Sequence, residues 1–159
     1  MINKTLIFRR VTFLFFLSWQ GLIYWFSSRT AAQSGKSSGP ITKAIVKLFY
    51  ENEVNVSTLS QIEFFVRKSA HLILFCVLGA IIAVYLLQFK SFKRRLVFWV
   101  SLLVTAVSGI FDEVHQYFVP GRACKFFDVF VDTFGGLIGI SLVILCYYFI
   151  IKKHSRIPR

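Results

Sequence analysis

The chain has 159 residues, the length of a single domain, and it is 56% hydrophobic and 18% aromatic but only 16% charged. Soluble domains are about 45–50% apolar and about 25% charged, so this composition argues against a soluble globular protein and predicts a bundle of membrane helices in one domain, residues 1–159. The net charge of +12 would indicate nucleic-acid binding in a soluble protein, but basic residues also accumulate on the cytoplasmic side of membrane proteins.

Four segments are long and apolar enough to cross a hydrocarbon core of about 30 Å, which takes about 20 helical residues. Arg9 and Arg10 interrupt the first segment near its start, where long basic side chains can reach the interface. A signal peptide cleaved near Ala31-Ala32 is the alternative for this segment, and its long, bulky apolar stretch disfavours that interpretation. The sequence therefore predicts an all-α fold of four transmembrane helices, over residues 6–26, 70–89, 96–118 and 126–151.

The segment between the first two spans, residues 27–59, is predicted to be a long extracytoplasmic loop. Its Ser/Gly-rich part, residues 34–40, is expected to be irregular. Residues 41–49 then place apolar side chains at helical spacing, which predicts a short amphipathic helix on the outer leaflet or on top of the bundle. Ser60 and Glu63 fit a capping box, so the second membrane helix is expected to begin near Ser60.

Basic residues predict the orientation of the chain in the membrane. The segments before the first span, between the second and third, and after the fourth contain bases and no acid, whereas all seven acids lie on the other side. Both termini are therefore expected in the cytoplasm. Most of the net charge is then an orientation signal, and no nucleic-acid partner is expected. The cytoplasmic bases are Lys4, Arg9, Arg10, Lys90, Lys93, Arg94, Arg95, Lys152, Lys153, Arg156 and Arg159.

Polar side chains gather at the outer ends of the second, third and fourth spans, where they are costly and become candidates for function. Helical spacing places several of them on shared faces, such as Arg67 with His71 and Asp128 with Asp132. Small residues follow on the fourth span, where Gly135-x-x-x-Gly139 allows a close approach between helices. The charges balance, with Arg67, Lys68, Arg122 and Lys125 against Asp112, Glu113, Asp128 and Asp132.

Several interpretations of this cluster remain open. A neutral, self-paired network would hold the helices together without further function. Two histidines favour a site instead, because an imidazole with an ordinary pKa of about 6.5 suits proton transfer at neutral pH. Recognition of an anionic headgroup without chemistry is a further possibility. A metal held by Asp112, Glu113, His115 and His71 is disfavoured because no tight ligand motif is present, so neither a metal nor another cofactor is expected.

If the protein is an enzyme, the residue types predict separate roles. Arg67 and Arg122 would clamp an anion, and Glu113 with His115 would be the acid/base pair. The predicted catalytic residues are Glu113, His115, Asp112 and His71, and the predicted ligand-binding residues are Arg67, Lys68, Gln116, Arg122, Asp128 and Asp132.

The chain resembles the VanZ-like family of small bacterial membrane proteins over about residues 20–142. The resemblance rests on Phe26-Ser-Ser-Arg-Thr-Ala-Ala-Gln-Ser34, Arg67-Lys-Ser-Ala-His71, Leu78-Gly79, Asp112-Glu-Val-His-Gln-Tyr-Phe-Val-Pro-Gly-Arg122 and Asp128-Val-x-x-Asp132-x-x-Gly135-Gly136. It implies that the motif residues are functional: Arg67, Lys68, His71, Asp112, Glu113, Gln116, Pro120, Gly121, Arg122, Asp128, Asp132 and Gly135.

The sequence departs from the family pattern at two positions. Leu74 stands where many relatives have Glu, which weakens a metal site built on the second helix, and Arg29 stands where relatives often have Gln. The family is named for a protein linked to resistance toward teicoplanin, a lipid-tailed glycopeptide acting on Gram-positive bacteria.

We therefore expect a cell-envelope protein that binds or acts on an anionic lipid-linked ligand at the outer leaflet. The ligand would be a cell-wall precursor, a phospholipid or a lipoglycopeptide. The alternatives are a non-catalytic module that shields the envelope or binds a partner protein, and a purely structural network.

Overall fold

The computed structural model describes residues 4–50 and 54–154 and contains five helices and no strand within these ranges. All the helices except the second are long and apolar enough to span a membrane, which makes the chain a multi-pass membrane protein. The four predicted spans agree with these helices to within three residues, apart from one helix start. The helices are α1 (Lys4–Ser27), α2 (Ala31–Phe49), α3 (Val56–Leu87), α4 (Arg94–Tyr117) and α5 (Phe126–His154).

Helix α2 occupies the part of the outer segment that was predicted to be irregular, and that prediction was wrong. The Oγ1 atom of Thr30 accepts a hydrogen bond from the Gln33 amide, and the Gln33 side chain accepts one from the Thr30 amide, which is a capping box. Within the helix, Ser38 and Thr42 hydroxyls donate to carbonyls of the preceding turn. Pro40 lies inside the helix without ending it. A good N-terminal cap therefore outweighs the turn-like composition that follows it.

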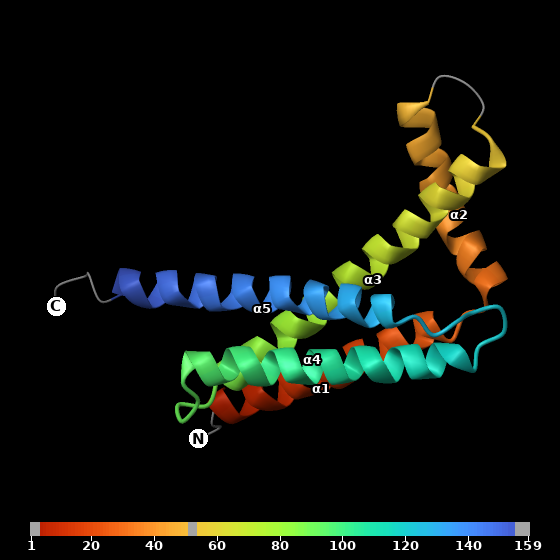
Figure 1. The fold of residues 1–159 in the computed structure, drawn as a ribbon. Coiled ribbons are helices and arrows are strands. Elements are labelled where there is room, and N and C mark those ends of the chain that lie inside the picture. Colours follow the sequence, from red (N-terminus) through yellow and green to blue (C-terminus); the bar gives the residue numbers. More distant parts are fainter. Residues whose placement is uncertain (1–3, 51–53, 155–159) are drawn as a thin grey trace.

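Helix α3 begins at Val56, four residues before the predicted start. Asn55 is the cap, since its side chain accepts a hydrogen bond of 2.8 Å from the Thr58 amide. The Ser60 hydroxyl instead donates to the Ser57 carbonyl, so the predicted capping box lies inside the helix. With 32 residues, α3 is about 48 Å long and exceeds the hydrocarbon core. Its first turns project from the bundle together with α2 (Figure 1).

Glycines let α3 and α5 cross at very short range, as the sequence predicted. A Cβ atom added at Gly135 would collide with the backbone carbonyl of Leu72, and one added at Gly139 would collide with that of Cys76. The two backbones are thus in direct contact, which small residues make possible in membrane bundles. Figure 1 shows α3 passing obliquely behind α5, with α4 running alongside α5. This crossing brings the polar residues of α3 and α5 to the same level.

Helix α4 turns its polar face inward, the reverse of a helix in a soluble protein. Its buried side is small and polar, whereas Trp99, Leu103 and Phe111 are exposed. Exposed apolar side chains of this kind suit contact with lipid, and the interior then carries the polar groups. The buried residues of α4 are Val97, Ser101, Thr105, Gly109, Asp112, Glu113 and Gln116.

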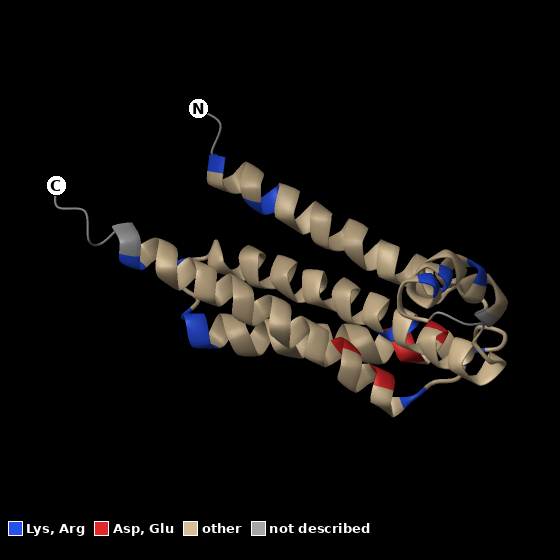
Figure 2. Cartoon of the chain, turned by 90° about the horizontal axis from the view of Figure 1, so that it is seen from above, with Lys and Arg blue, Asp and Glu red and all other residues tan. Residues whose placement is uncertain are grey.

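Charged residues separate along the bundle. The start of α1, the α3–α4 turn and the end of α5 lie at one end (Figure 1), where the described residues include bases and no acid. Arg9 at this end donates a hydrogen bond to the Gln88 carbonyl. The described acids gather toward the opposite end, near the α1–α2 and α4–α5 links (Figure 2). Glu51, Glu53, Arg156 and Arg159, on which the orientation prediction also drew, lie outside the described residues.

Candidate functional site

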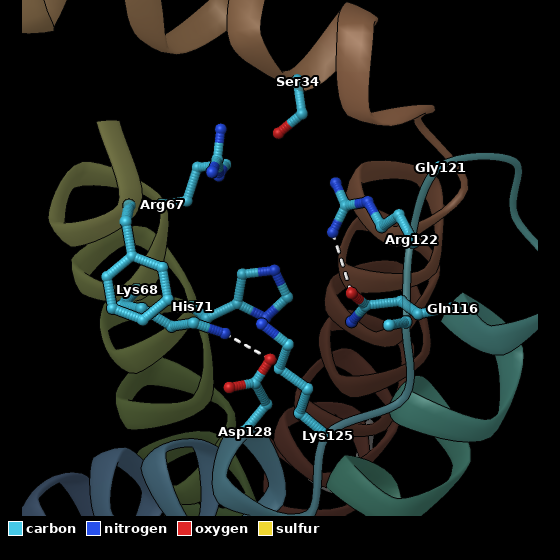
Figure 3. A pocket seen from close by; sticks show the side chains of 11 residues that line it. Ser34, Arg67, Lys68, His71, Gln116, Gly121, Arg122, Lys125 and Asp128 are labelled. Atoms are coloured by element: carbon cyan, nitrogen blue, oxygen red, sulfur yellow. Dashed lines mark hydrogen bonds and ion pairs between the residues drawn. The ribbon is translucent and has the colours of Figure 1, made fainter. Parts of the chain in front are cut away.

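A polar cavity of about 220 Å³ lies at the acidic end of the bundle, where α2, α3 and the α4–α5 link meet (Figure 3). Arg67 on α3 and Arg122 on the link flank it, and Ser34 of α2 lies over it. The site thus draws on elements that are far apart in the sequence. The lining residues are Ser34, Phe64, Arg67, Lys68, His71, Gln116, Gly121, Arg122, Ala123, Lys125 and Asp128.

Three titratable side chains from three helices converge at the inner side of this cavity. The Nδ1 atom of His71 lies 3.6 Å from Oδ1 of Asp132 and 3.9 Å from Oδ2 of Asp112. The side chain of His71 is 16% exposed, whereas both aspartate side chains are 2% exposed. In the described part of the chain, this group is the one cluster of at least three His, Cys, Asp or Glu residues with ligand atoms close enough to hold a metal ion.

Hydrogen bonds connect the α4–α5 link to this group. The Gln116 amide nitrogen donates to Oδ2 of Asp112 at 2.7 Å, and its oxygen accepts a bond of 2.8 Å from the Arg122 guanidinium. Arg122 also donates from Nε to the Arg29 carbonyl at 3.0 Å, which ties the link to the segment before α2. Gly121 has a φ of 78°, a conformation that glycine adopts easily, so the turn can direct Arg122 inward.

Burial lowers the pKa of the Arg122 guanidinium below its ordinary value, while nearby acids, Asp112 foremost among them, oppose that shift. Because a guanidinium is a far stronger base than neutral pH can titrate, Arg122 still carries its charge. It is therefore a partly buried permanent cation beside the cavity.

Glu113 is fully enclosed and lies outside the cavity lining. One carboxylate oxygen accepts a hydrogen bond of 3.1 Å from Gln116, and the other accepts one of 3.0 Å from the backbone amide of Lys125. The first bond lies within α4, and the second attaches the α4–α5 link to α4, so both oxygens are engaged. This geometry gives Glu113 a supporting place in the site.

His115 lies apart from the cavity, in contrast to its predicted pairing with Glu113. Its Nε2 atom is 3.0 Å from the Ser28 hydroxyl, and its ring stacks on Tyr24 at a centroid distance of 4.2 Å. Residues two apart in a helix point in different directions, and here His115 faces α1. The structure therefore does not assemble the predicted acid/base pair.

Of the remaining predicted residues, Lys68 and Asp128 form an ion pair, and Arg67 is a partly exposed cation. Lys68 and Asp128 form an ion pair across α3 and α5 at the cavity wall (Figure 3). Within the described part of the chain, the ion pair of Arg67 is a loose contact with Glu63, at 3.9 Å, and the Arg67 side chain is 37% exposed. The Arg67 and Arg122 side chains thus face each other across the opening, and the Lys68–Asp128 pair lies to one side (Figure 3).

A second cavity of about 390 Å³ adjoins the polar one and is mainly apolar. The two share four lining residues, Ser34, Arg67, His71 and Arg122. Helix α2 contributes to both, which the sequence interpretation missed because residues 34–40 were expected to be irregular. The Thr30–Gln33 capping box was the signal that could have placed Ser34 on a helix. The other residues of the apolar cavity are Phe26, Arg29, Ser37, Ser38, Ile41, Val66, Ala70, Ile73 and Leu74.

Comparison with known proteins identifies the family. A family model described as VanZ/LLP1 matches residues 12–149, most of the chain. The protein belongs to the VanZ/LLP1 family. No curated protein and no solved structure gives a significant match.

The motif residues of this VanZ/LLP1 protein converge in space although they are spread over 69 positions, from 67 to 135. Seven of them line the polar cavity, and Asp112 and Asp132 are buried next to His71. Gly135 contributes through the close contact with α3. Most of the residues that the family resemblance singled out therefore lie in or beside one cavity. The seven lining residues are Arg67, Lys68, His71, Gln116, Gly121, Arg122 and Asp128.

Proposed function

We infer that this VanZ/LLP1 protein binds the anionic headgroup of a lipid-linked ligand at the outer leaflet of a bacterial membrane. The observation that carries the inference is the junction of the two cavities. A polar cavity flanked by two guanidinium groups meets an apolar cavity, and Arg67, His71 and Arg122 border both. An amphiphile placed across this junction would put its charged group and its chain in matching surroundings.

The charges favour an anion as the polar part of the ligand. Asp128 is paired with Lys68, and Glu113 accepts two hydrogen bonds. Arg67 and Arg122 are permanent cations whose planar donors suit phosphate or carboxylate oxygens, to which they can bind with two parallel hydrogen bonds. A headgroup between them would lie in a partly buried place, where such bonds are stronger than in water.

The adjoining cavity suits an apolar chain. Side chains of Phe26, Ile41 and Leu74 line it. Its volume of about 390 Å³ lies in the range of about 300–1,000 Å³ found for small-molecule sites. The walls come from α1, α2 and α3, so a chain bound there would lie next to the lipid-facing surface.

The proposed orientation places this junction outside the cytoplasm. The opposite end of the bundle carries the bases of the α1 start and the α3–α4 turn, and positive residues favour the cytoplasmic side. Ligands reached from the outer leaflet include phospholipids, polyprenyl-phosphate precursors of the cell wall and lipoglycopeptides. Resistance to teicoplanin would follow if the bound ligand were the antibiotic or its target.

Binding rather than conversion is the proposal, because the predicted acid/base pair is not assembled. His115 faces Tyr24 and Ser28, and both oxygens of Glu113 are engaged. The alternative with no ligand, a helix-pairing network, draws on the Lys68–Asp128 pair. This alternative predicts that removing the charge of Arg67 or Arg122 changes the stability of the protein and not its affinity for a ligand.

A binding experiment tests the proposal. The full chain, reconstituted in phosphatidylcholine nanodiscs, is titrated with phosphatidylglycerol, a polyprenyl phosphate and teicoplanin. We expect at least one of these probes to bind. We expect Arg67→Gln and Arg122→Gln each to weaken its binding at least tenfold, which is about 1.4 kcal/mol. The reason is that each variant loses charge-assisted hydrogen bonds to the ligand worth about 1.5–3 kcal/mol.

Lys43→Gln is the matched control, since Lys43 is an exposed base of α2 outside both cavities. It removes the same charge and should leave binding unchanged. Equal affinities of the two arginine variants and Lys43→Gln, or no binding of any of the three probes, would refute the proposal.

A further inference from the structure

We propose that His71, Asp112 and Asp132 bind a divalent transition-metal ion at the inner side of the polar cavity. One residue comes from each of α3, α4 and α5, and their nearest ligand atoms all lie within 4.8 Å of one another. The proposal does not depend on the lipid-linked ligand, because these three side chains would form a complete protein ligand set by themselves.

The separations between these atoms fit shared coordination better than hydrogen bonding. The distances from Nδ1 of His71 to the two carboxylate oxygens are 3.6 and 3.9 Å, longer than the 2.7–3.2 Å of a protein hydrogen bond. Two ligands bound at about 2.0–2.2 Å to one ion lie about 3–4 Å apart. The side chains thus approach one another with a gap between them that an ion of this size would fill.

One carboxylate oxygen of the group has no hydrogen-bond partner among the described residues. The Oδ2 atom of Asp132 is buried without a hydrogen bond, and the residue as a whole is 1% exposed. A buried, unpaired carboxylate oxygen is costly, and more so at membrane depth. Buried polar groups that lack a protein partner commonly have an unseen water or ion as their partner. A bound cation would neutralise the carboxylate and take up this free acceptor.

The nearby cations do not pair directly with these two aspartates. Among the described contacts, Lys68 pairs with Asp128, and the hydrogen bonds of Arg122 go to Gln116 and to the Arg29 carbonyl. The charge on Asp112 and Asp132 is therefore met at close range by His71 alone. A divalent cation would balance two carboxylates and leave the imidazole neutral, which is the form that binds metal.

Outer contacts hold the two acidic ligands in place. Gln116 donates to Oδ2 of Asp112, and Arg122 fixes the orientation of the Gln116 amide from its other end. Gly109 packs against Asp132, so closely that an added Cβ would lie 3.3 Å from that of Asp132. Such supporting contacts orient metal ligands and raise affinity.

The donor set indicates the class of ion. An imidazole nitrogen suits Zn²⁺ and other transition metals, whereas Mg²⁺ and Ca²⁺ prefer oxygen alone. Three protein ligands leave at least one coordination position for water or a ligand atom. Because His71 lines the polar cavity, that position would face the same space as the two arginines.

Metal binding by the full chain in detergent, without added lipid, tests the proposal. The protein is treated with a chelator, dialysed and titrated with Zn²⁺ and with Mn²⁺ by calorimetry, and bound metal is counted by mass spectrometry. We expect one ion per chain for at least one of the two metals. We also expect His71→Gln and Asp132→Asn to weaken binding at least tenfold, and His115→Gln, which alters a histidine outside the site, to leave it unchanged.

Thermal unfolding keeps the test decisive if a variant folds poorly. Because a ligand that binds only the folded state stabilises it, the metal should raise the unfolding midpoint of the wild type and of His115→Gln. A stoichiometry near zero, or no shift in the wild-type midpoint, would overturn the proposal. Loss of the ion in Asp132→Asn with unchanged phosphatidylglycerol binding would leave the proposed lipid site standing, so the two can fail separately.

Discussion

Gln116 holds the site together at the scale of single residues. Its amide nitrogen donates to Asp112 and to Glu113, while its oxygen accepts from Arg122. An amide suits this place because it offers donors to two acids and an acceptor to a base while carrying no charge. The Gln116 side chain is buried, so each of these bonds satisfies a group with little access to water.

Substitution of Gln116 tests this role. Gln116→Leu should lower the free energy of unfolding by about 3 kcal/mol or more, because it leaves groups of Asp112, Glu113 and Arg122 short of a partner at about 1–3 kcal/mol each. The midpoint of thermal unfolding in detergent measures the effect. Gln61→Leu, at an exposed position of α3, is the control and should change the midpoint little. Equal midpoints for the two variants would contradict the assigned role.

At the scale of elements, the contact between α3 and α5 decides which side chains meet. The backbone of α5 at Gly135 lies against the Leu72 carbonyl of α3. Leu72 comes one residue after His71, and Gly135 comes three residues after Asp132. The same helices make the same kind of contact one turn further on, at Gly139 and Cys76. Close helix approach thus positions the proposed metal ligands, so packing and site geometry are linked.

Adding one methyl group tests this contact. Gly135→Ala should destabilise the fold by several kcal/mol or shift α5, because the new Cβ would collide with backbone, which cannot move aside cheaply. Gly21→Ala in α1 meets nothing within 4 Å and should be neutral or stabilising by up to about 1 kcal/mol. Thermal unfolding of both variants gives the comparison, and a Gly135→Ala protein as stable as Gly21→Ala would contradict the close crossing.

At the scale of the whole molecule, the four long helices form a bundle with two chemically different ends. One end carries bases, and the other holds the described acids (Figure 2). The two cavities lie at the acidic end. The start of α1 and the end of α5 lie at the same end of the bundle (Figure 1). The proposed orientation places that end in the cytoplasm.

A native cysteine reports on this orientation. Cys124 is exposed on the α4–α5 link, whereas Cys76 and Cys146 lie within membrane helices. A membrane-impermeant maleimide added to intact cells should therefore label the wild type and not Cys124→Ser. Labelling that appears only after the cells are opened would place the link in the cytoplasm and overturn the proposed orientation.

The membrane helices were predictable from the sequence because a helix in lipid satisfies its own backbone hydrogen bonds, so spanning is a property of one apolar segment. Shared faces such as those of Arg67 with His71, and Asp128 with Asp132, were also local, since helical spacing alone defines them. The resemblance of the motif residues correctly indicated the family. The start of α3 and the helix over residues 34–40 were missed because an apparent cap at Ser60 and the Ser/Gly-rich composition were weighed above the capping residues Asn55 and Thr30, whose side chains accept hydrogen bonds from the first turn of each helix.

The sequence alone does not determine which side chains of different helices contact one another. Asp112 and His115 are three residues apart on α4, yet one meets His71 and the other meets Tyr24. The rotation of each helix about its axis, set by packing along its whole length, determines this difference. Likewise, the sequence showed no metal-ligand motif because His71, Asp112 and Asp132 come from three helices. The proximity of His71 and Asp132 follows from the glycine contact between α3 and α5, which joins residues more than 60 positions apart, and Gly109 and Gly136 bring α4 close to α5.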